Sequence, residues 1–119
     1  MDKATNEFNN FTLVNEKYES ILDIIGTQFK TTKEIREAKK TIFRYLTKSF
    51  SGLSYKRLAD MFESVKKEYP EKLYKNSTVD DIRLNLFYFA SYIAEIGESY
   101  KDYGYSLLLA YFFWITRDI

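Results

Sequence analysis

Apolar residues recur at steps of three and four along most of this 119-residue chain, while residues that build turns are scarce. Side chains three and four positions apart lie on one face of an α-helix, so this spacing predicts helices. The chain holds only four Gly and one Pro. Because a protein made of many short strands needs frequent turns, this scarcity favours a few long helices. We therefore expect an all-α protein.

Five helices are predicted from the apolar spacing together with the residues that start and stop helices. Their ranges are 5–29, 31–50, 54–69, 78–96 and 99–118. Hydroxyl side chains that can cap a helix N-terminus occur at Thr31, at Ser54 and at Ser77 or Thr78. Gly52 and Pro70 are typical of helix ends, because glycine accepts a left-handed conformation and the residue before proline resists helix.

The segment from Leu84 to Ile96 is apolar nearly all round the predicted helix, which is typical of a helix surrounded by others. The predicted fold is a compact bundle of four to five helices with this apolar central helix. No linker or repeat interrupts the pattern, so we expect residues 1–119 to form a single helical domain.

The chain contains no Cys and no His. Disulfides and thiolate metal sites are thereby excluded, and the most common general base and metal ligand is missing. Glu95, Glu98 and Asp102 come close together along the chain, but carboxylate metal sites in helical bundles normally add Glu-x-x-His ligands. We interpret them as a solvated helix end. The sequence thus predicts a protein that is not an enzyme, with no catalytic residue, metal or cofactor.

The first residues show no signal-peptide pattern, and the longest apolar run, Leu107 to Ile115, is nine residues. A membrane-spanning helix needs about twenty. We expect a cytoplasmic protein that is not transmembrane.

Basic residues gather on one predicted helix. Between Lys30 and Arg57 there are nine Lys or Arg and two Glu, although the net charge of the whole chain is only +1. Five of them step by three or four along one face, which makes a candidate basic face for phosphates or an acidic partner: Lys33, Arg36, Lys40, Arg44 and Lys48. Few aromatic residues interleave with them, so base stacking is not indicated. The alternative is an ordinary solvated helix face.

Aromatic residues gather near the other end of the sequence. Because Tyr and Trp are enriched at the centres of interfaces, this segment is a candidate partner-binding surface, which could also support a homodimer. Its candidate residues are Tyr103, Tyr105, Tyr111, Phe112 and Trp114. The alternative is that the other helices fold over this segment and make it core.

Two short segments support a resemblance to a known family. The sequence Leu53-Ser54-Tyr55-Lys56-Arg57 opens a mid-chain helix, and Tyr103-Gly104-Tyr105 follows near the end. Both are similar to patterns in the immunity proteins that protect producers of pediocin-like bacteriocins. The resemblance implies a cytoplasmic helical bundle that blocks a toxin-bound membrane receptor, with its C-terminal half setting specificity.

These observations lead to ranked hypotheses. The first is a non-enzymatic binding protein, an immunity or antagonist protein that blocks a toxin or its receptor complex, with a protein partner that could be membrane-associated. The alternative is a small helical nucleic-acid-associated subunit of a virus, mobile element or defence complex, which would use the candidate basic face. A third is a viral bundle similar to the Bcl-2 group, whose core also contains an apolar central helix.

Overall fold

The computed structural model describes residues 29–47, 52–69, 78–95 and 101–119. Within them the chain forms four α-helices, one short 3₁₀ helix and no strand, so the all-α prediction is confirmed. The elements are α3 (Thr32–Thr47), α4 (Tyr55–Glu63), η1 (Lys66–Glu68), α5 (Val79–Glu95) and α6 (Lys101–Ile115). The helix predicted over 5–29 lies outside the described residues, apart from Phe29, which is buried.

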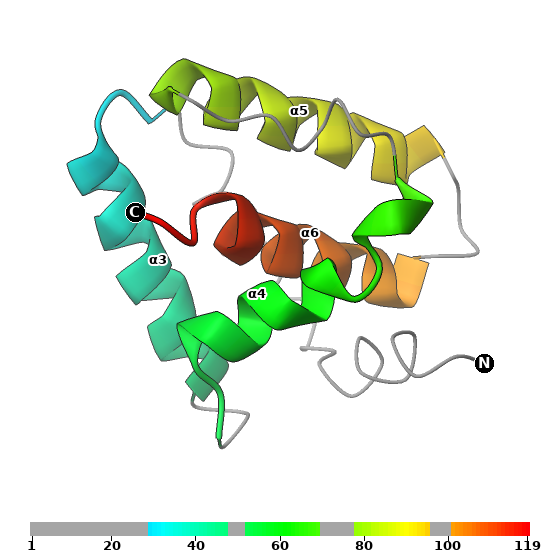
Figure 1. The fold of residues 1–119 in the computed structure, drawn as a ribbon, viewed down its shortest axis with the longest axis horizontal. Coiled ribbons are helices and arrows are strands. Elements are labelled where there is room, and N and C mark those ends of the chain that lie inside the picture. Colours follow the sequence, from blue (N-terminus) through cyan, green and yellow to red (C-terminus); the bar gives the residue numbers. More distant parts are fainter. Residues whose placement is uncertain (1–28, 48–51, 70–77, 96–100) are drawn as a thin grey trace.

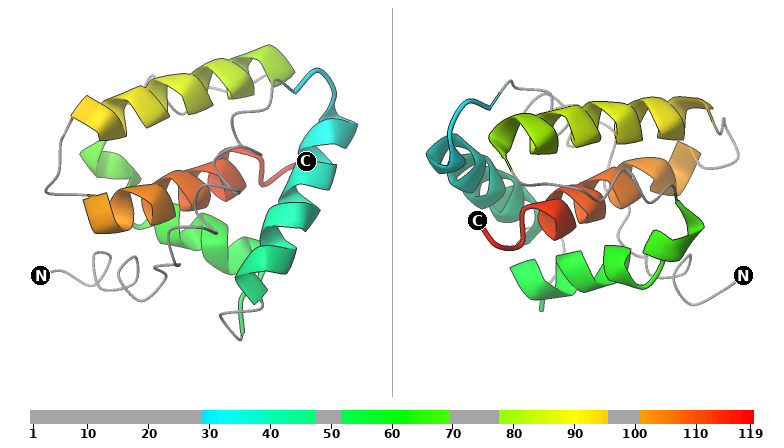
Figure 2. Two further views of the ribbon diagram at one scale, coloured as in Figure 1. Left: turned by 180° about the vertical axis from the view of Figure 1, so that it is seen from behind. Right: turned by 45° about the horizontal axis from the view of Figure 1, so that its top comes forward.

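The central helix of the bundle is α6. Figures 1 and 2 show it between α5 and α4, with α3 lying across the ends of the other helices. Every residue from Leu107 to Thr116 is buried. The prediction that the helix over 78–96 is central is therefore wrong: α5 packs one side against α6 and leaves the other exposed. A helix late in the sequence can still be central, because earlier helices can fold around it.

The first turn of α3 follows the predicted capping pattern. The backbone N–H of Glu34 donates to Oγ1 of Thr31 at 3.2 Å, and the Glu34 carboxylate accepts the backbone N–H of Lys30 at 3.4 Å. Two backbone donors at the start of the helix are thus satisfied by side chains. The predicted cap residue Thr31 thus lies at the start of this helix.

The starts of α4 and α5 are also as predicted. The hydroxyl of Ser54 accepts the backbone N–H of Arg57 at 3.0 Å, and that of Thr78 accepts the backbone N–H of Asp81 at 3.1 Å. Gly52 has φ +75°, the left-handed conformation that glycine adopts without steric cost. Ser54 thus has its predicted role as a cap, while the helix end predicted beside Gly52 involves residues 48–51, which lie outside the described part.

The end of α4 differs from the prediction, because the helix stops at Glu63 rather than near residue 69. The Ser64 hydroxyl donates to the carbonyl of Met61 at 2.8 Å, and the N–H of Val65 donates to the carbonyl of Phe62 at 3.0 Å. A serine hydroxyl that donates to the carbonyl of the preceding turn competes with the α-helical pattern. A backbone hydrogen bond between residues i and i−3 also competes with it, because that bond belongs to the tighter 3₁₀ helix. The short η1 then completes the turn.

The core is largely aromatic where α4, α5 and α6 meet. The ring of Phe62 on α4 lies 5.6 Å from Phe89 on α5, 4.9 Å from Tyr111 and 5.2 Å from Trp114, both on α6, measured between centroids. Such contacts add to the free energy that aromatic burial provides. The radius of gyration, 13.2 Å, is that of a compact chain of this length, roughly 13–14 Å. No helix among the described residues is long and apolar enough to cross a membrane.

Candidate functional site

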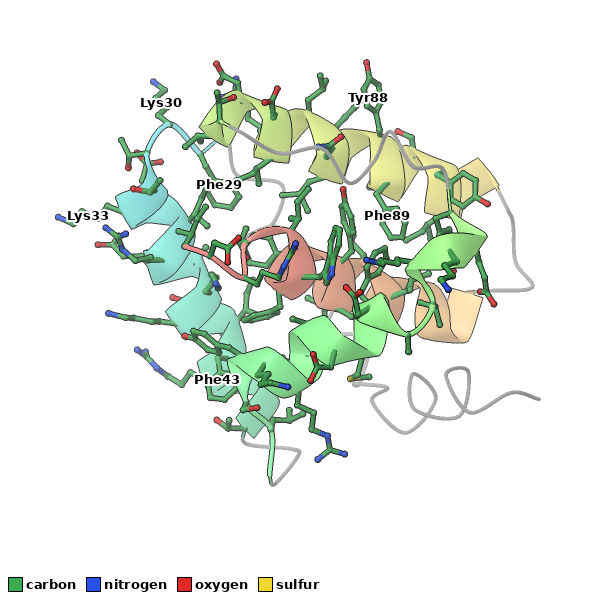
Figure 3. The ribbon with its side chains drawn as sticks, in the orientation of Figure 1. Phe29, Lys30, Lys33, Phe43, Tyr88 and Phe89 are labelled. Carbon is green, nitrogen blue, oxygen red and sulfur yellow. The ribbon has the colours of Figure 1, made fainter. Side chains whose placement is uncertain are left out.

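The structure brings the predicted basic residues of α3 onto its solvent side. Lys33, Arg36, Lys40 and Arg44 are all exposed, and we call these four the basic face; Lys48 lies outside the described residues. In Figure 3 the side chain of Lys33 points away from the molecule. The three ion pairs found among the described residues are Lys56–Asp60, Lys66–Glu63 and Arg83–Asp80, so none of them neutralises the basic face.

A neighbouring lysine on α3 has a different environment. Lys39 is buried, and its Nζ donates to the carbonyls of Thr116 at 2.6 Å and Ile119 at 3.3 Å. These carbonyls follow the last turn of α6, where a cation stabilises the negative end of the helix dipole. Burial lowers the pKa of Lys39, and the charge of Asp118 opposes that shift. Lys39 is therefore a structural cap and not part of the basic face.

The first turn of α4 lies beside the C-terminal half of α3. The rings of Phe43 and Tyr55 are 4.8 Å apart and perpendicular, and Nζ of Lys39 lies 5.2 Å from the Tyr55 ring centre. Tyr55 is 38% exposed, and burial raises the pKa of its hydroxyl. Arg57 in the same turn is exposed. Tertiary contact thus places the aromatic ring of Tyr55 beside α3.

Three of the five candidate partner-binding residues are core residues. Tyr111 and Phe112 are fully buried, and Trp114 is 4% exposed. They do not form an outer binding surface in this fold, because they are buried; for these three residues the structure shows the alternative, that they are core. Tyr103 and Tyr105 lie in the first turns of α6, and their side chains are outside the described part.

Trp114 belongs to a polar cluster that joins α4 to the end of α6. Its indole N–H donates to the Glu63 carboxylate at 2.6 Å, while the Arg117 guanidinium lies 4.3 Å from its ring centre. Lys66 pairs with the same carboxylate at 2.7 Å. Hydrogen bonds from Lys66 and then from Trp114 lower the pKa of Glu63. The cluster fixes two elements to each other.

Among the described residues, the large apolar side chains that are exposed lie on α5, apart from Tyr55 on α4. Leu84, Phe87 and Tyr88 are 49%, 66% and 48% exposed, and we call these three the apolar face of α5. Figure 3 shows Tyr88 directed away from the bundle, while the adjacent Phe89 points inward. Because the segment 84–96 looked uniformly apolar, sequence analysis missed this face. A weak signal was available, since Asp80 and Ser91 fall on the same side of the helix by spacing.

The carboxylates that sequence analysis weighed as a metal site, Glu95, Glu98 and Asp102, have side chains outside the described part of the structure. Among the residues that are described, no group of three or more acidic side chains is placed to hold a metal ion. The candidate site thus consists of two surfaces, the basic face on α3 and the apolar face on α5. No protein-family model, curated protein or solved structure matches this chain.

Proposed function

We propose that this chain is a non-enzymatic binding protein that docks a partner protein on the apolar face of α5. The observation that supports this is the exposure of three large side chains within about one turn of α5, with Phe87 at 66%. Soluble proteins rarely leave contiguous apolar surface in water unless it meets a partner. The proposed docking surface therefore lies on α5 and not on the C-terminal aromatic segment, which the sequence had suggested.

The charges near this face define the chemistry of the partner. Arg83 is the only basic residue of α5, and it is already paired with Asp80 at 2.8 Å. Asp81 follows in the same turn. A complementary partner surface would have an apolar centre that packs on the apolar face of α5. It would also carry basic residues opposite the first turn of α5, where Asp80 and Asp81 lie. At 17 residues, α5 is about 25 Å long, sufficient to present one face to a groove or to another helix.

The immunity or antagonist role is the biological form that we propose for this binding. The resemblance to bacteriocin immunity proteins implies that the C-terminal half sets specificity, and α5 lies in that half. Occupying a surface of a toxin–receptor complex needs no catalytic group. Expression of the protein in a cell sensitive to a pediocin-like bacteriocin should protect that cell, and expression of Phe87→Gln should protect it less. Equal survival with and without the protein would remove this role while leaving the docking proposal open to its own test.

Replacement of Phe87 by Gln tests the docking surface. Glutamine keeps helix propensity and removes the ring, and because Phe87 is already largely exposed the fold should be unaffected. Central aromatic contacts typically contribute about 2 kcal/mol or more to binding, so a partner should bind the variant roughly thirtyfold more weakly. The partner would first be captured from host lysate, with and without nuclease, and its Kd then measured with both proteins purified.

Arg44→Gln is the matched control, since it also places glutamine at an exposed helical site, on α3 instead of α5. It should leave the Kd of a partner docked on α5 within about twofold. If Phe87→Gln and Tyr88→Gln together changed the Kd no more than this control does, the apolar face would not be the docking surface. Circular dichroism of each variant should show unchanged helix content.

A further inference from the structure

We propose that the basic face of α3 is a second and independent interaction surface that binds the phosphate backbone of double-stranded DNA. Lys33 and Arg44 are eleven positions apart on α3, which places the two ends of the face about 16 Å apart along the helix. Four cations at one-turn intervals can reach several successive phosphates of one groove edge.

Among the described residues, no ion pair neutralises the charge of this face. Of the two acids on α3, Glu34 accepts the backbone N–H of Lys30 in the capping turn. Glu37 is the remaining acid, exposed among four exposed cations. None of the ion pairs among the described residues involves α3. A local excess of positive charge therefore persists on a protein whose net charge is only +1, which directs a polyanion to this one side.

The helix that carries these cations is held rigidly. Ile35, Ile42 and Leu46 on its inner side are fully buried, and Lys39 hydrogen-bonds to the end of α6. The basic side chains therefore extend from a backbone that is already ordered, so ligand binding should cost little further backbone entropy. A regular helix also fits the B-form major groove, which is about 12 Å wide.

The composition of the face favours nucleic acid over an acidic protein. Protein interfaces are enriched in aromatic residues at their centre and depleted in lysine, whereas backbone contacts to DNA come from Lys and Arg. The nearest exposed ring, Tyr55, lies at the edge, and its surroundings are already filled by Phe43, Phe113 and Lys39. It is not free to stack on an unpaired base, which favours a duplex over single strands. The deep, narrow major groove of duplex RNA does not admit a helix, which favours DNA.

The test is fluorescence anisotropy with a labelled 20-base-pair DNA duplex of arbitrary sequence, titrated between 50 and 200 mM salt. Four phosphate contacts should give a slope of log K against log salt of about −3.6. Lys40→Gln should reduce the slope by about 0.9 and weaken binding about eightfold at 0.1 M salt. The double variant Lys33→Gln, Lys40→Gln should halve the slope. Helicity by circular dichroism should be unchanged, since both residues are exposed.

Lys67→Gln is the matched control, because Lys67 is also an exposed lysine and lies on η1. It should keep the wild-type slope; an equal loss in this variant would show a general charge effect and overturn the proposal. Absence of wild-type binding at 50 mM salt would overturn it as well. Tighter binding of a 20-nucleotide dT strand, or equal binding of duplex RNA, would overturn the assignment to double-stranded DNA. Phe87→Gln should leave DNA affinity unchanged, which separates this proposal from docking on α5.

Discussion

Lys39 and Lys40 are adjacent and chemically identical, yet the fold gives them opposite roles. Lys39 is buried and donates to carbonyls at the end of α6, while Lys40 is exposed on the basic face. The difference follows from helical spacing, because position 39 lies four after Ile35 and three before Ile42, on the inner side of α3. A buried ammonium is stable only when hydrogen-bonded, and the C-terminal carbonyls of α6 supply that bonding.

Lys39→Met should therefore destabilise the protein far more than Lys40→Met. Methionine fills a similar volume but leaves the carbonyls of Thr116 and Ile119 without the lysine donor, which typically costs about 1–3 kcal/mol. Lys40→Met should change the free energy of unfolding by less than about 0.5 kcal/mol. Urea unfolding of the two variants measures the difference. Similar stabilities would show that Lys39 does not cap α6.

Glu63 should make stability depend on acid pH. Its pKa is lowered from 4.5 by the hydrogen bonds from Lys66 and Trp114. The stabilisation that Glu63 adds to the free energy of unfolding is therefore complete above pH 4.5. That contribution is lost as pH falls below 4.5 through the lower pKa of the folded state. Glu63→Gln should thus be less stable than wild type at pH 7 and approach it at pH 3. Urea unfolding followed by the fluorescence of Trp114, the one Trp of the chain, measures this.

The control for Glu63 is Glu68→Gln, which removes an exposed carboxylate from η1. This variant shows the effect of losing a carboxylate without losing the hydrogen bonds that Lys66 and Trp114 make with Glu63. A constant difference between wild type and Glu63→Gln across this range would argue against a lowered pKa for Glu63.

At the level of the elements, the main result is the exchange of roles between α5 and α6. Both segments are strongly apolar in sequence, and α5 was predicted to be central. In the structure every described side chain of α6 is buried, whereas α5 has one inner side, represented by Phe89, and one outer side, represented by Phe87. Apolar residues on all sides of a helix permit burial but do not decide which of two such helices is surrounded.

Replacing one leucine in each helix tests this arrangement. Leu109→Ala in α6 should destabilise the protein by about 2–5 kcal/mol, because Leu109 is fully buried and its truncation leaves a cavity. Leu84→Ala in α5 should cost less than about 1 kcal/mol, because Leu84 is 49% exposed. Denaturant midpoints at a constant m-value measure both changes. Comparable losses in the two variants would mean that α5 is covered as fully as α6.

At the scale of the whole molecule, the two proposed interaction surfaces lie on different parts of the bundle. Figures 1 and 2 show α3 and α5 at different places around α6. The described side chains of α6 belong to the core, and the exposed residues of the basic face and of the apolar face belong to α3 and α5. The residues that carry the two proposals are therefore exposed and belong to different helices. Substitutions there can change binding without changing the fold, which is why each proposal can be tested by itself.

The sequence alone determined the helical class, the starts of α3, α4 and α5, and the composition of the basic face. These features are local, because a cap or a helical face depends on residues within a turn or two of each other. For the same reason Ile35, Ile42, Leu58 and Phe62 could be assigned to the core, and all four are buried.

Only the tertiary structure decided which apolar helix is central, which aromatic residues remain exposed, and that Tyr55 lies beside α3. Each depends on contacts between segments far apart in the chain, such as Lys39 with Thr116 or Phe62 with Tyr111. The hydrophobic effect favours burial of any apolar area, so it does not by itself determine which of two apolar helices becomes central. The choice between α5 and α6 was therefore made by packing, and with it the position of the candidate docking surface.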